Sequence, residues 1–259
     1  MINIKDFTSL DISYNNAKRK ILISDSVRVE FMSERSLEQM RDVVLNENLT
    51  CPDIFYTSYL SVSRYKDIDI WTKGKYTYDI TIMQSNLAGI EYIKTYGHYN
   101  ISAETNMCDQ TEVIEILYGG CIALIQKPLR IDENNFDYSS TEEINLLKLG
   151  RHDKILIPKG YAVTLINNKS NVLIFGSFGT KKRKSYTSPL SLMHGMSYYI
   201  IRKNARTEIV KNSNYTNVSK IKKPKLSDFN DKITSKILKT KKSVYLDYIK
   251  NQNKFDSLF

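Results

Sequence analysis

The sequence contains few of the residues that mark several protein classes. Its 259 residues include three cysteines, three histidines, one tryptophan and five prolines. Cys51, Cys108 and Cys121 form no Cys-x-x-Cys motif, which argues against a disulfide framework and a thiolate metal site. No apolar run approaches the roughly 18 residues of a membrane helix. The first residues, MINIKDFTSLDIS, lack the apolar stretch of a signal peptide. We therefore expect a soluble, cytoplasmic protein with no membrane contact.

Sequence motifs of common enzyme classes are missing as well. The chain has no internal repeat, no glycine-rich phosphate loop, no His-Glu-x-x-His motif and no nucleophile elbow. The sequence therefore gives no sign of a P-loop nucleotide site, a metalloprotease or an α/β-hydrolase.

The net charge of +10 is concentrated in one part of the chain. Residues 220–259 contain 11 lysines and 4 aspartates and so carry +7 of the total. A nucleic-acid groove would place its basic residues on the folded body instead, and the point charge of lysine suits solvation more than base reading. We interpret this tail as a solvated, partly helical extension and expect no nucleic-acid partner. A nucleic-acid-binding arm is the alternative.

From Ile54 onward the sequence has the texture of β-strands. Each segment is rich in β-branched or aromatic residues, and turn residues separate most of them. The predicted strands are IFYTSYLSV, YTYDITIM, GIEYIKTY, EVIEILYGG, CIALIQK, DKILIPKG, YAVTLIN, NVLIFGSF and, later, SYYIIRK. The absence of long helical stretches among the first eight excludes βαβ units and predicts a sandwich or barrel. Gly119-Gly120 indicates a tight hairpin between two of these strands.

Three segments depart from the strand pattern. SERSLEQMRDVV has apolar residues at helical spacing, with Ser33 as the predicted N-cap. The acidic stretch from Ile131 to Glu143 predicts an inserted surface loop. The tail has an approximate helical stripe that could pack back on the body or contact a partner. The stripe consists of Phe229, Ile233, Ile237, Leu238, Tyr245 and Tyr248.

One stretch carries most of the functional information. Gly97-His98-Tyr99-Asn100 is followed, twelve residues later, by Glu112 at the start of a predicted strand. Here the sequence resembles the cupin-type phosphoglucose isomerases, which place Gly-His-aromatic-His on one strand and a glutamate at the start of the next. The resemblance continues in the family's order from SERSLEQMRDVV to about Arg206, and it leaves out the tail.

The resemblance implies the fold class. We expect a mainly β chain with a cupin-like double-stranded β-barrel (jelly roll), an N-terminal helix and a C-terminal helical extension. The predicted division is residues 1–50 for N-terminal strands and a helix packed on the barrel, 51–210 for the cupin barrel, and 211–259 for the lysine-rich extension. Relatives are commonly homodimers, and exposed strand edges suit the pairing of two copies.

In that family, three histidines and one glutamate hold a divalent metal in the mouth of the barrel. His98 and Glu112 stand at the positions of the first histidine and the glutamate, whereas Asn100 and Val163 replace the other two histidines. One imidazole, one carboxylate and a weak amide oxygen fall short of a facial triad, and valine cannot ligate. The candidate metal set is therefore His98, Asn100 and Glu112. We expect no tightly bound cofactor there; a weakly held divalent metal is the alternative.

The resemblance also implies a phosphate cradle. Thr81, Thr95, Gly97 and Tyr56 fall where the family holds the phosphate of its substrate. Hydroxyls and a close backbone N–H donate to phosphate oxygens without a bulky side chain between them. Threonine is also an ordinary strand residue, so it is the joint retention of these positions that favours a phosphorylated sugar as ligand. Tyr186 resembles a tyrosine near the family's sugar end.

The predicted function is a sugar-phosphate isomerase-like cupin, nearest to the interconversion of glucose 6-phosphate and fructose 6-phosphate. This reaction needs a base of near-neutral pKa and an electrophile over two oxygens. Glu112 is the candidate base, with a raised pKa if the barrel mouth excludes water; a carboxylate merely paired with a lysine is the alternative. His98, Asn100 and Lys184 are the candidate electrophiles, although the run Lys181–Lys184 can equally be a solvated turn.

Two other functions fit the same residues. One is a metal-free, non-catalytic cupin that binds a sugar phosphate. The other is a cupin enzyme acting on another anionic sugar derivative in a biosynthetic pathway. A shared fold and a retained pocket do not fix the reaction, so the sequence leaves these alternatives open.

Overall fold

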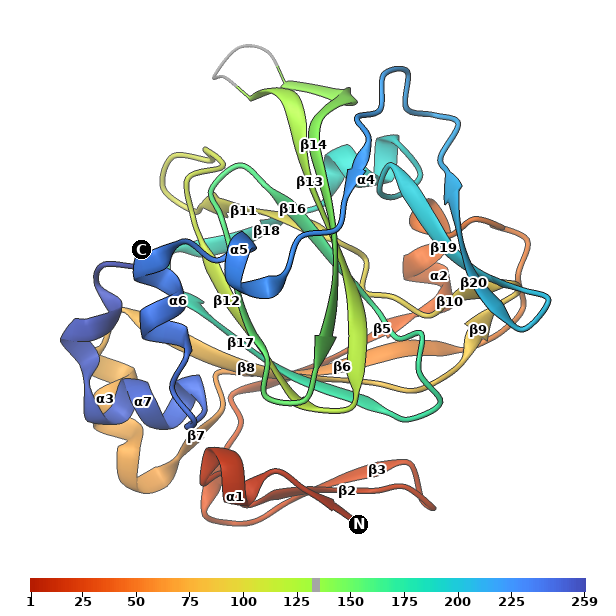
Figure 1. Cartoon of the computed structure of the whole chain (residues 1–259). Helices are drawn as coiled ribbons and strands as arrows, with labels where there is room; N and C mark the ends of the chain where they lie inside the picture. Colours follow the sequence, from red (N-terminus) through yellow and green to blue (C-terminus); the bar gives the residue numbers. More distant parts are fainter. Residues whose placement is uncertain (132–135) are drawn as a thin grey trace.

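The computed structural model describes residues 1–131 and 136–259, without the side chains of residues 131, 136, 232 and 233. Two six-stranded sheets form the body of the protein (Figure 1). The first has the order β18 (Arg183–Tyr186), β11 (His98–Ser102), β16 (Ala162–Ile166), β13 (Gly120–Ile131), β14 (Phe136–Gly150) and β21 (Ile221–Lys222). The second has the order β15 (Lys154–Ile157), β12 (Glu112–Tyr118), β17 (Leu173–Thr180), β8 (Tyr76–Met83), β6 (Ile54–Leu60) and β5 (Phe31–Ser36). Except for the parallel pair β14–β21, these neighbours are antiparallel.

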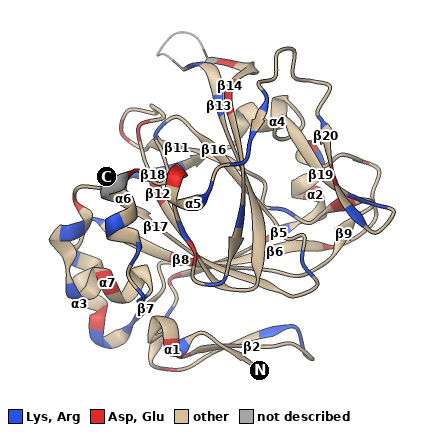
Figure 2. Ribbon diagram, in the orientation of Figure 1, with Lys and Arg blue, Asp and Glu red and all other residues tan. Residues whose placement is uncertain are grey.

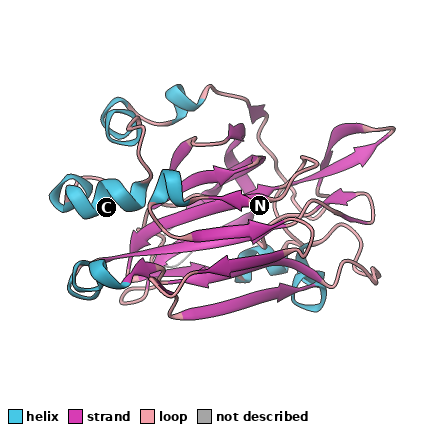
Figure 3. Cartoon of the chain, turned by 90° about the horizontal axis from the view of Figure 1, so that it is seen from below, coloured by secondary structure: helices cyan, strands magenta, loops and turns pink. Residues whose placement is uncertain are grey.

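Smaller elements surround the two sheets. The short strands are β1 (Ile2–Asn3), β2 (Ile12–Asn15), β3 (Lys20–Ile23), β4 (Val27–Arg28), β7 (Ser63–Arg64), β9 (Leu87–Ala88), β10 (Glu91–Tyr92), β19 (Tyr198–Lys203) and β20 (Arg206–Lys211). The α-helices are α1 (Lys5–Thr8), α2 (Leu37–Met40), α3 (Ile68–Lys73), α4 (Ser188–Leu192), α5 (Leu226–Phe229), α6 (Lys232–Leu238) and α7 (Val244–Lys250), and 3-10 turns cover Arg41–Val43, Tyr65–Asp67 and Gln252–Phe255. Figure 3 shows the strands running alongside one another, with most helices at the periphery. The predicted mainly β, barrel-type fold is confirmed. None of the described helices is long and apolar enough to span a membrane.

The alternation of strand residues decides which side chains face the inside of the barrel. On β8, Tyr76, Tyr78, Ile80 and Ile82 belong to an apolar cluster on the outer face of the sheet. The intervening Asp79 and Thr81 line a cavity between the sheets. Because successive strand residues point to opposite faces, one strand supplies both an apolar outer surface and a polar inner one.

The C-terminal tail covers that outer surface. Tyr245, Tyr248, Phe255 and Leu258 are buried and share an apolar cluster with Tyr78, Phe178 and Trp71 of the body. The tail lysines at positions 236, 239, 241 and 242 stay exposed, and Figure 2 marks the basic residues along the ribbon of this region. The interpretation of the tail as a solvated extension is therefore wrong. The helical stripe packs back on the barrel, with the side chain of Ile233 outside the described part of the chain.

Two predicted local features are also corrected. Gly119-Gly120 does not form a hairpin, because β12 and β13 belong to different sheets. Gly119 instead makes the crossing between them at φ 82°, where a Cβ atom would lie 2.5 Å from the carbonyl oxygen of Val172. Helix α2 begins after Ser36, not Ser33. The hydroxyl of Ser36 accepts a hydrogen bond from the backbone N–H of Gln39, and the side-chain oxygen of Gln39 accepts one from the backbone N–H of Ser36, which completes a capping box. Ser33 lies within β5.

The segment from Ile131 to Glu143 is mostly strand rather than an inserted loop. β13 runs to Ile131 and pairs with β14, which begins at Phe136. Residues 132–135, which the loop prediction also covered, lie outside the described residues. The loop was predicted because the side chains of this segment are polar. The ends of β13 and β14 project from the body (Figure 1), so these strands need no continuous apolar face there.

Candidate functional site

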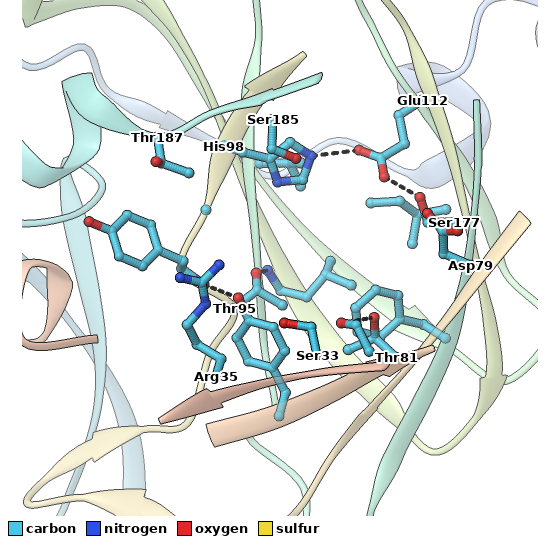
Figure 4. Close-up of a pocket in the computed structure, with 18 of the residues that line it drawn as sticks. Ser33, Arg35, Asp79, Thr81, Thr95, His98, Glu112, Ser177, Ser185 and Thr187 are labelled. Atoms are coloured by element: carbon cyan, nitrogen blue, oxygen red, sulfur yellow. Dashed lines mark hydrogen bonds and ion pairs between the residues drawn. The ribbon is translucent and has the colours of Figure 1, made fainter. Parts of the chain in front are cut away.

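A cavity of about 270 Å³ opens between the two sheets and is shown in Figure 4. Strands from both sheets contribute to its wall: β8, β12 and β17 on one side and β11, β16 and β18 on the other. β5, β6 and the segment from Thr95 to Gly97 complete the lining. Six of the residues predicted from the sequence line this cavity, namely Tyr56, Thr81, Thr95, Gly97, His98 and Glu112.

Glu112 is the centre of a hydrogen-bonded cluster at one side of the cavity. It is 3% exposed, and each of its carboxylate oxygens has two partners. Oε1 contacts a guanidinium nitrogen of Arg183 at 2.6 Å and accepts a hydrogen bond from the hydroxyl of Ser177. Oε2 lies 2.9 Å from Nε2 of His98 and accepts from Nδ2 of Asn100 at 3.2 Å. A carboxylate offers about four acceptor sites, so Glu112 is saturated.

These partners settle the protonation state of Glu112. Burial opposes ionisation and by itself raises the pKa of the carboxyl group. The charge of Arg183 and the interactions with His98 and Ser177 outweigh burial and hold the pKa of Glu112 well below its usual range. The raised pKa expected for Glu112 is therefore wrong, because the prediction did not include a buried cation beside it. Ionised Glu112 also accepts from His98, which places a proton on Nε2 of that ring.

Asn100 lies behind the cavity wall rather than in it. Its side chain is 2% exposed and is occupied at both ends. Nδ2 donates to Glu112, and Oδ1 accepts from Nη1 of Arg183 at 3.4 Å. Val163, paired across the sheet with His98, lines the cavity but carries no ligand atom. Asn100 thus positions its charged neighbours.

This donor set does not fit a divalent metal. Both oxygens of Glu112 are occupied, Asn100 has its oxygen turned to Arg183, and valine offers nothing. A guanidinium already supplies the positive charge that would compensate Glu112. Within residues 1–131 and 136–259, no three His, Cys, Asp or Glu side chains are grouped to hold an ion. His98 and Glu112 do meet, as the family pattern requires, but they meet as a hydrogen-bonded pair.

The structure corrects the placement of Lys184. Lys184 is exposed and is absent from the cavity wall, whereas its neighbours Arg183 and Ser185 line it. All three lie on β18, so period-two alternation turns Lys184 to the other face. Tyr186 has the same parity as Lys184 and is also absent from the wall. It is paired with Tyr99 in the neighbouring strand and packs against the apolar core.

Arg183 is the cavity residue that sequence reasoning missed most clearly. Its side chain is only 9% exposed, and its second terminal nitrogen contacts Ser177 at 3.2 Å and lies 3.8 Å from Asp79. Arg183 belongs to the run Lys181–Lys184, where four adjacent cations give no sign of which one turns inward. The inward residue depends on where β18 begins after its turn.

Asp79 was missed although the sequence held a signal for it. Period-two alternation puts Asp79 on the same face as Thr81, which was already assigned to the cavity. Oδ1 of Asp79 accepts from the backbone N–H of Ser61 at 2.8 Å and from the hydroxyl of Thr77 at 3.3 Å. Among the described residues, Oδ2 has the long contact with Arg183. Burial raises the pKa of Asp79, and Arg183 and Ser61 offset this only in part. Asp79 is thus a more basic carboxylate than Glu112, with one oxygen less engaged.

A second set of groups lines the part of the cavity away from Glu112 (Figure 4). Thr95 accepts from the backbone N–H of Leu165 at 3.0 Å and Thr81 lies 2.9 Å from the hydroxyl of Ser58, so both hydroxyls sit in fixed positions. Gly97 has φ 86°, and a Cβ atom there would lie 2.9 Å from Leu190. Only glycine adopts this backbone without strain, and its bare backbone borders the cavity.

Arg35, also unforeseen, provides a cation on this side. It is the last residue but one of β5 and lines the cavity (Figure 4). Its guanidinium stands 5.4 Å from the ring centre of Tyr96, a cation–π contact. The cavity therefore holds two cations, Arg35 near Tyr96 and Arg183 between Glu112 and Asp79.

Comparisons with known proteins match a family model to most of the chain. The family model described as "Glucose-6-phosphate isomerase (GPI)" matches residues 35–218, more than half of the chain. The comparison with curated proteins finds no match. Among solved structures, a sugar phosphate isomerase from a cupin superfamily of Silicibacter pomeroyi is similar at 10% identity and a TM-score of 0.35, with 76% of this chain and 94% of that chain covered.

Plant vicilins are similar over a shorter stretch. The vicilin from Solanum melongena has 13% identity and a TM-score of 0.35, and that from Capsicum annuum has 10% identity and a TM-score of 0.37. Each alignment covers 54% of this chain. The chain spans about a third of the length of these vicilins, 32% and 33%.

Proposed function

The chain belongs to the glucose-6-phosphate isomerase (GPI) family, and on that premise we propose that it is an isomerase-like cupin acting on a sugar phosphate, with glucose 6-phosphate and fructose 6-phosphate as the nearest substrates. One observation carries the proposal: the same cavity is lined by Arg35 with two threonine hydroxyls and by two carboxylates with His98 and Arg183. A sugar phosphate has this polarity, with a dianion at one end and the reacting C1 and C2 at the other.

The anionic end of the ligand fits the side with Arg35. Thr81, Thr95 and the backbone beside Gly97 border the cavity there, and Arg35 adds a charge. Hydroxyl and N–H donors fix the direction of a phosphate, and a guanidinium can bind it with two parallel hydrogen bonds. This orientation places the opposite end of the ligand against Asp79, Glu112 and His98.

The two threonines give the first prediction. We expect Thr81→Val combined with Thr95→Val to weaken the binding of glucose 6-phosphate by about 1–3 kcal/mol, because phosphate oxygens would lose their hydrogen-bond partners. Titration calorimetry measures the change. Thr57→Val is the matched control, since Thr57 lies on neighbouring β6 and borders a different surface hollow. Equal affinity in the parent and the double variant, or no binding by the parent, would contradict the proposed ligand.

The reaction needs a group that moves a proton between C2 and C1. The base removes the proton from C2 of the aldose, and an enediolate forms. The same group returns the proton to C1, while the proton of the C2 hydroxyl passes to O1, which gives the ketose. Glu112 was the sequence candidate, but its oxygens are saturated and its pKa is depressed. We assign the proton transfer to Asp79, whose pKa burial raises and whose Oδ2 is nearly unengaged. Glu112 then holds His98 and Arg183 in place.

The assignment of Asp79 gives the second prediction. Asp79→Asn should lower kcat of glucose 6-phosphate isomerisation by about 100- to 10,000-fold, the usual range for a general base. Activity of the parent should fall on acidification, because a base works unprotonated and the raised pKa brings its protonation to higher pH. Asp69→Asn is the control, since Asp69 is exposed on α3. An Asp79→Asn protein as active as the parent would transfer the role to Glu112.

A non-catalytic binding protein is the alternative for the same cavity. It is favoured by the saturation of Glu112, since a ligand could bind without any proton transfer. Tight binding of glucose 6-phosphate without turnover in a coupled assay would favour this alternative.

The homodimer expected from the family stays a prediction. β5 lies at the edge of its sheet and exposes Phe31 and Met32, which suits pairing with a second copy.

A further inference from the structure

We propose that the guanidinium of Arg183 replaces a metal ion in this cavity, as a permanent organic cation that the fold builds in beside Glu112. Its second part, that this cation acts on the oxygens of a substrate, rests on the proposed function. The first part concerns only the protein and metal ions, and it can be tested without any substrate.

The contacts of Arg183 are those of a central cation. One terminal nitrogen contacts Glu112 at 2.6 Å and Asn100 at 3.4 Å, and the other contacts Ser177 at 3.2 Å and faces Asp79 at 3.8 Å. Two carboxylates and two neutral oxygens thus surround one positive group. Arginine stays charged at all accessible pH values, so the cavity needs no added ion to balance Glu112.

The fold also makes room for this side chain. Gly179, on β17, lies against it, and a Cβ atom at position 179 would come within 2.5 Å of Nε and 3.0 Å of Cδ of Arg183. The backbone at Gly179 does not have a positive φ, so conformation alone does not require glycine there. Glycine at position 179 leaves the space that the side chain of Arg183 occupies.

The residues around the cation are also unsuited to binding a metal. Asn100 donates to Glu112 and accepts from Arg183, so both polar atoms of its amide are engaged by the ion pair and its oxygen is not directed at a metal position. Val163, paired with His98, places an alkyl group where a further donor would be needed. A metal would have to displace the guanidinium from Glu112 and would still find only His98 as a nitrogen ligand.

In the proposed reaction, Arg183 would stabilise negative charge on the oxygens of the enediolate. Its hydrogen-bonding groups face protein partners, so it offers mainly a fixed charge in a partly water-excluded site, where electrostatic stabilisation is strong. Asp79 moves the carbon-bound proton from C2 to C1, a second proton passes from the C2 hydroxyl to O1, and the reaction needs no oxidant or reductant.

Restoring the missing ligands tests the first part. Asn100→His with Val163→His supplies two imidazoles beside His98 but leaves Arg183 on Glu112. Adding Arg183→Met frees the carboxylate. We expect the triple variant to bind Ni²⁺ at least about 100-fold more tightly than the double variant in calorimetry with nickel chloride alone. Adding Lys184→Met to the double variant is the control, because Lys184 faces away.

Equal nickel affinity in the double and triple variants would overturn the proposal, as would stoichiometric metal retained by the dialysed parent. If the triple variant fails to fold by circular dichroism, Gly179→Ala in the double variant displaces the arginine without removing it, and nickel affinity should again rise. No rise in that folded variant would also reject the proposal.

Turnover tests the second part. Isomerase activity of the parent should survive exhaustive treatment with a chelator. Arg183→Met should lower kcat by about 100- to 1,000-fold, and Arg183→Lys should recover part of the loss. Loss of activity on chelation would overturn the replacement of the metal. An inactive parent that still shows the nickel contrast would reject the proposed function and leave the built-in cation supported.

Discussion

A chain truncated after Asn217 is expected to be unfolded or insoluble. The truncation removes Tyr245, Tyr248, Phe255 and Leu258, each 5% exposed or less. Loss of one large buried side chain costs about 2–5 kcal/mol, and a whole domain is stable by only about 5–15 kcal/mol. The free energy lost with four such side chains is therefore expected to exceed the stability of the barrel. A tail outside the region matched by the family model is therefore still part of the folded body.

The contacts of the tail show what truncation would expose. Trp71 stacks on Tyr245 with 5.1 Å between ring centres, and Phe178 lies 5.2 Å from the rings of both Tyr248 and Phe255. Without the tail, these body aromatics form a contiguous apolar patch, which promotes aggregation.

Buried polar groups of the body depend on the tail as well. Glu115 is 1% exposed and accepts from the backbone N–H of Val244 at 2.9 Å. The ammonium of Lys154 donates to the carbonyl of Thr240 at 2.8 Å. Both groups would lose partners that compensate their burial, which adds to the cost of truncation.

Thermal melts and light scattering on the truncated chain provide the measurement. A full-length variant with Lys239, Lys241 and Lys242 changed to Gln is the control, since these exposed side chains carry charge without burial. It should melt within a few degrees of the parent while losing retention on heparin at low salt. A truncated chain that melts cooperatively near the parent temperature would show that the aromatic contacts contribute little.

The sequence predicts the barrel well because its strands alternate regularly. In YTYDITIM the period of two separates the outward Tyr78 from the inward Asp79 and Thr81. The tail is harder to predict, because its apolar residues are spread over three short helices with many lysines between them. Charge dominates the composition of such a segment, and only the pairing of Tyr245 and Tyr248 with aromatics elsewhere in the chain reveals its burial.

The candidate site is predictable where a motif fixes the spacing. His98 and Glu112 lie on separate strands, yet the motif brings them to 2.9 Å. Arg183 escaped prediction because its direction depends on one residue of register in β18, and a slip of one residue exchanges it with Lys184. The pKa of Glu112 depends in turn on Arg183. The prediction of a raised pKa for Glu112 therefore failed because the direction of Arg183 had not been predicted.

The buried pair of Glu112 and Arg183 gives the second large prediction. Glu112→Gln should destabilise the folded protein by about 3–5 kcal/mol, because it leaves a buried guanidinium with the more distant Asp79, at 3.8 Å, in place of its close counter-charge. Arg183 is 9% exposed and Glu112 4% exposed in their side chains, so water cannot compensate. Adding Arg183→Met should restore much of the loss, since removing both partners of a buried pair costs far less than removing one.

Urea denaturation of the two variants and the parent measures these differences. Glu104→Gln is the matched control, because Glu104 pairs with Lys182 at 2.9 Å with both side chains more than half exposed. Exposed pairs contribute about 0–1 kcal/mol, so this variant should behave like the parent. A Glu112→Gln protein within about 1 kcal/mol of the parent would show that Arg183 finds another partner or leaves the cavity.

The pH dependence of this stability difference has a definite sign. The pKa of Glu112 lies below its ordinary value of 4.5 in the folded state, because Arg183, His98 and Ser177 favour the ionised form against burial. The folded state is therefore stabilised by ionised Glu112 above pH 4.5, and this contribution is lost as the pH falls toward the depressed pKa. The gap between the parent and Glu112→Gln should stay constant near neutral pH and narrow on acidification below 4.5. A gap that widens in acid would mean that burial dominates and that the carboxyl group is protonated in the folded protein.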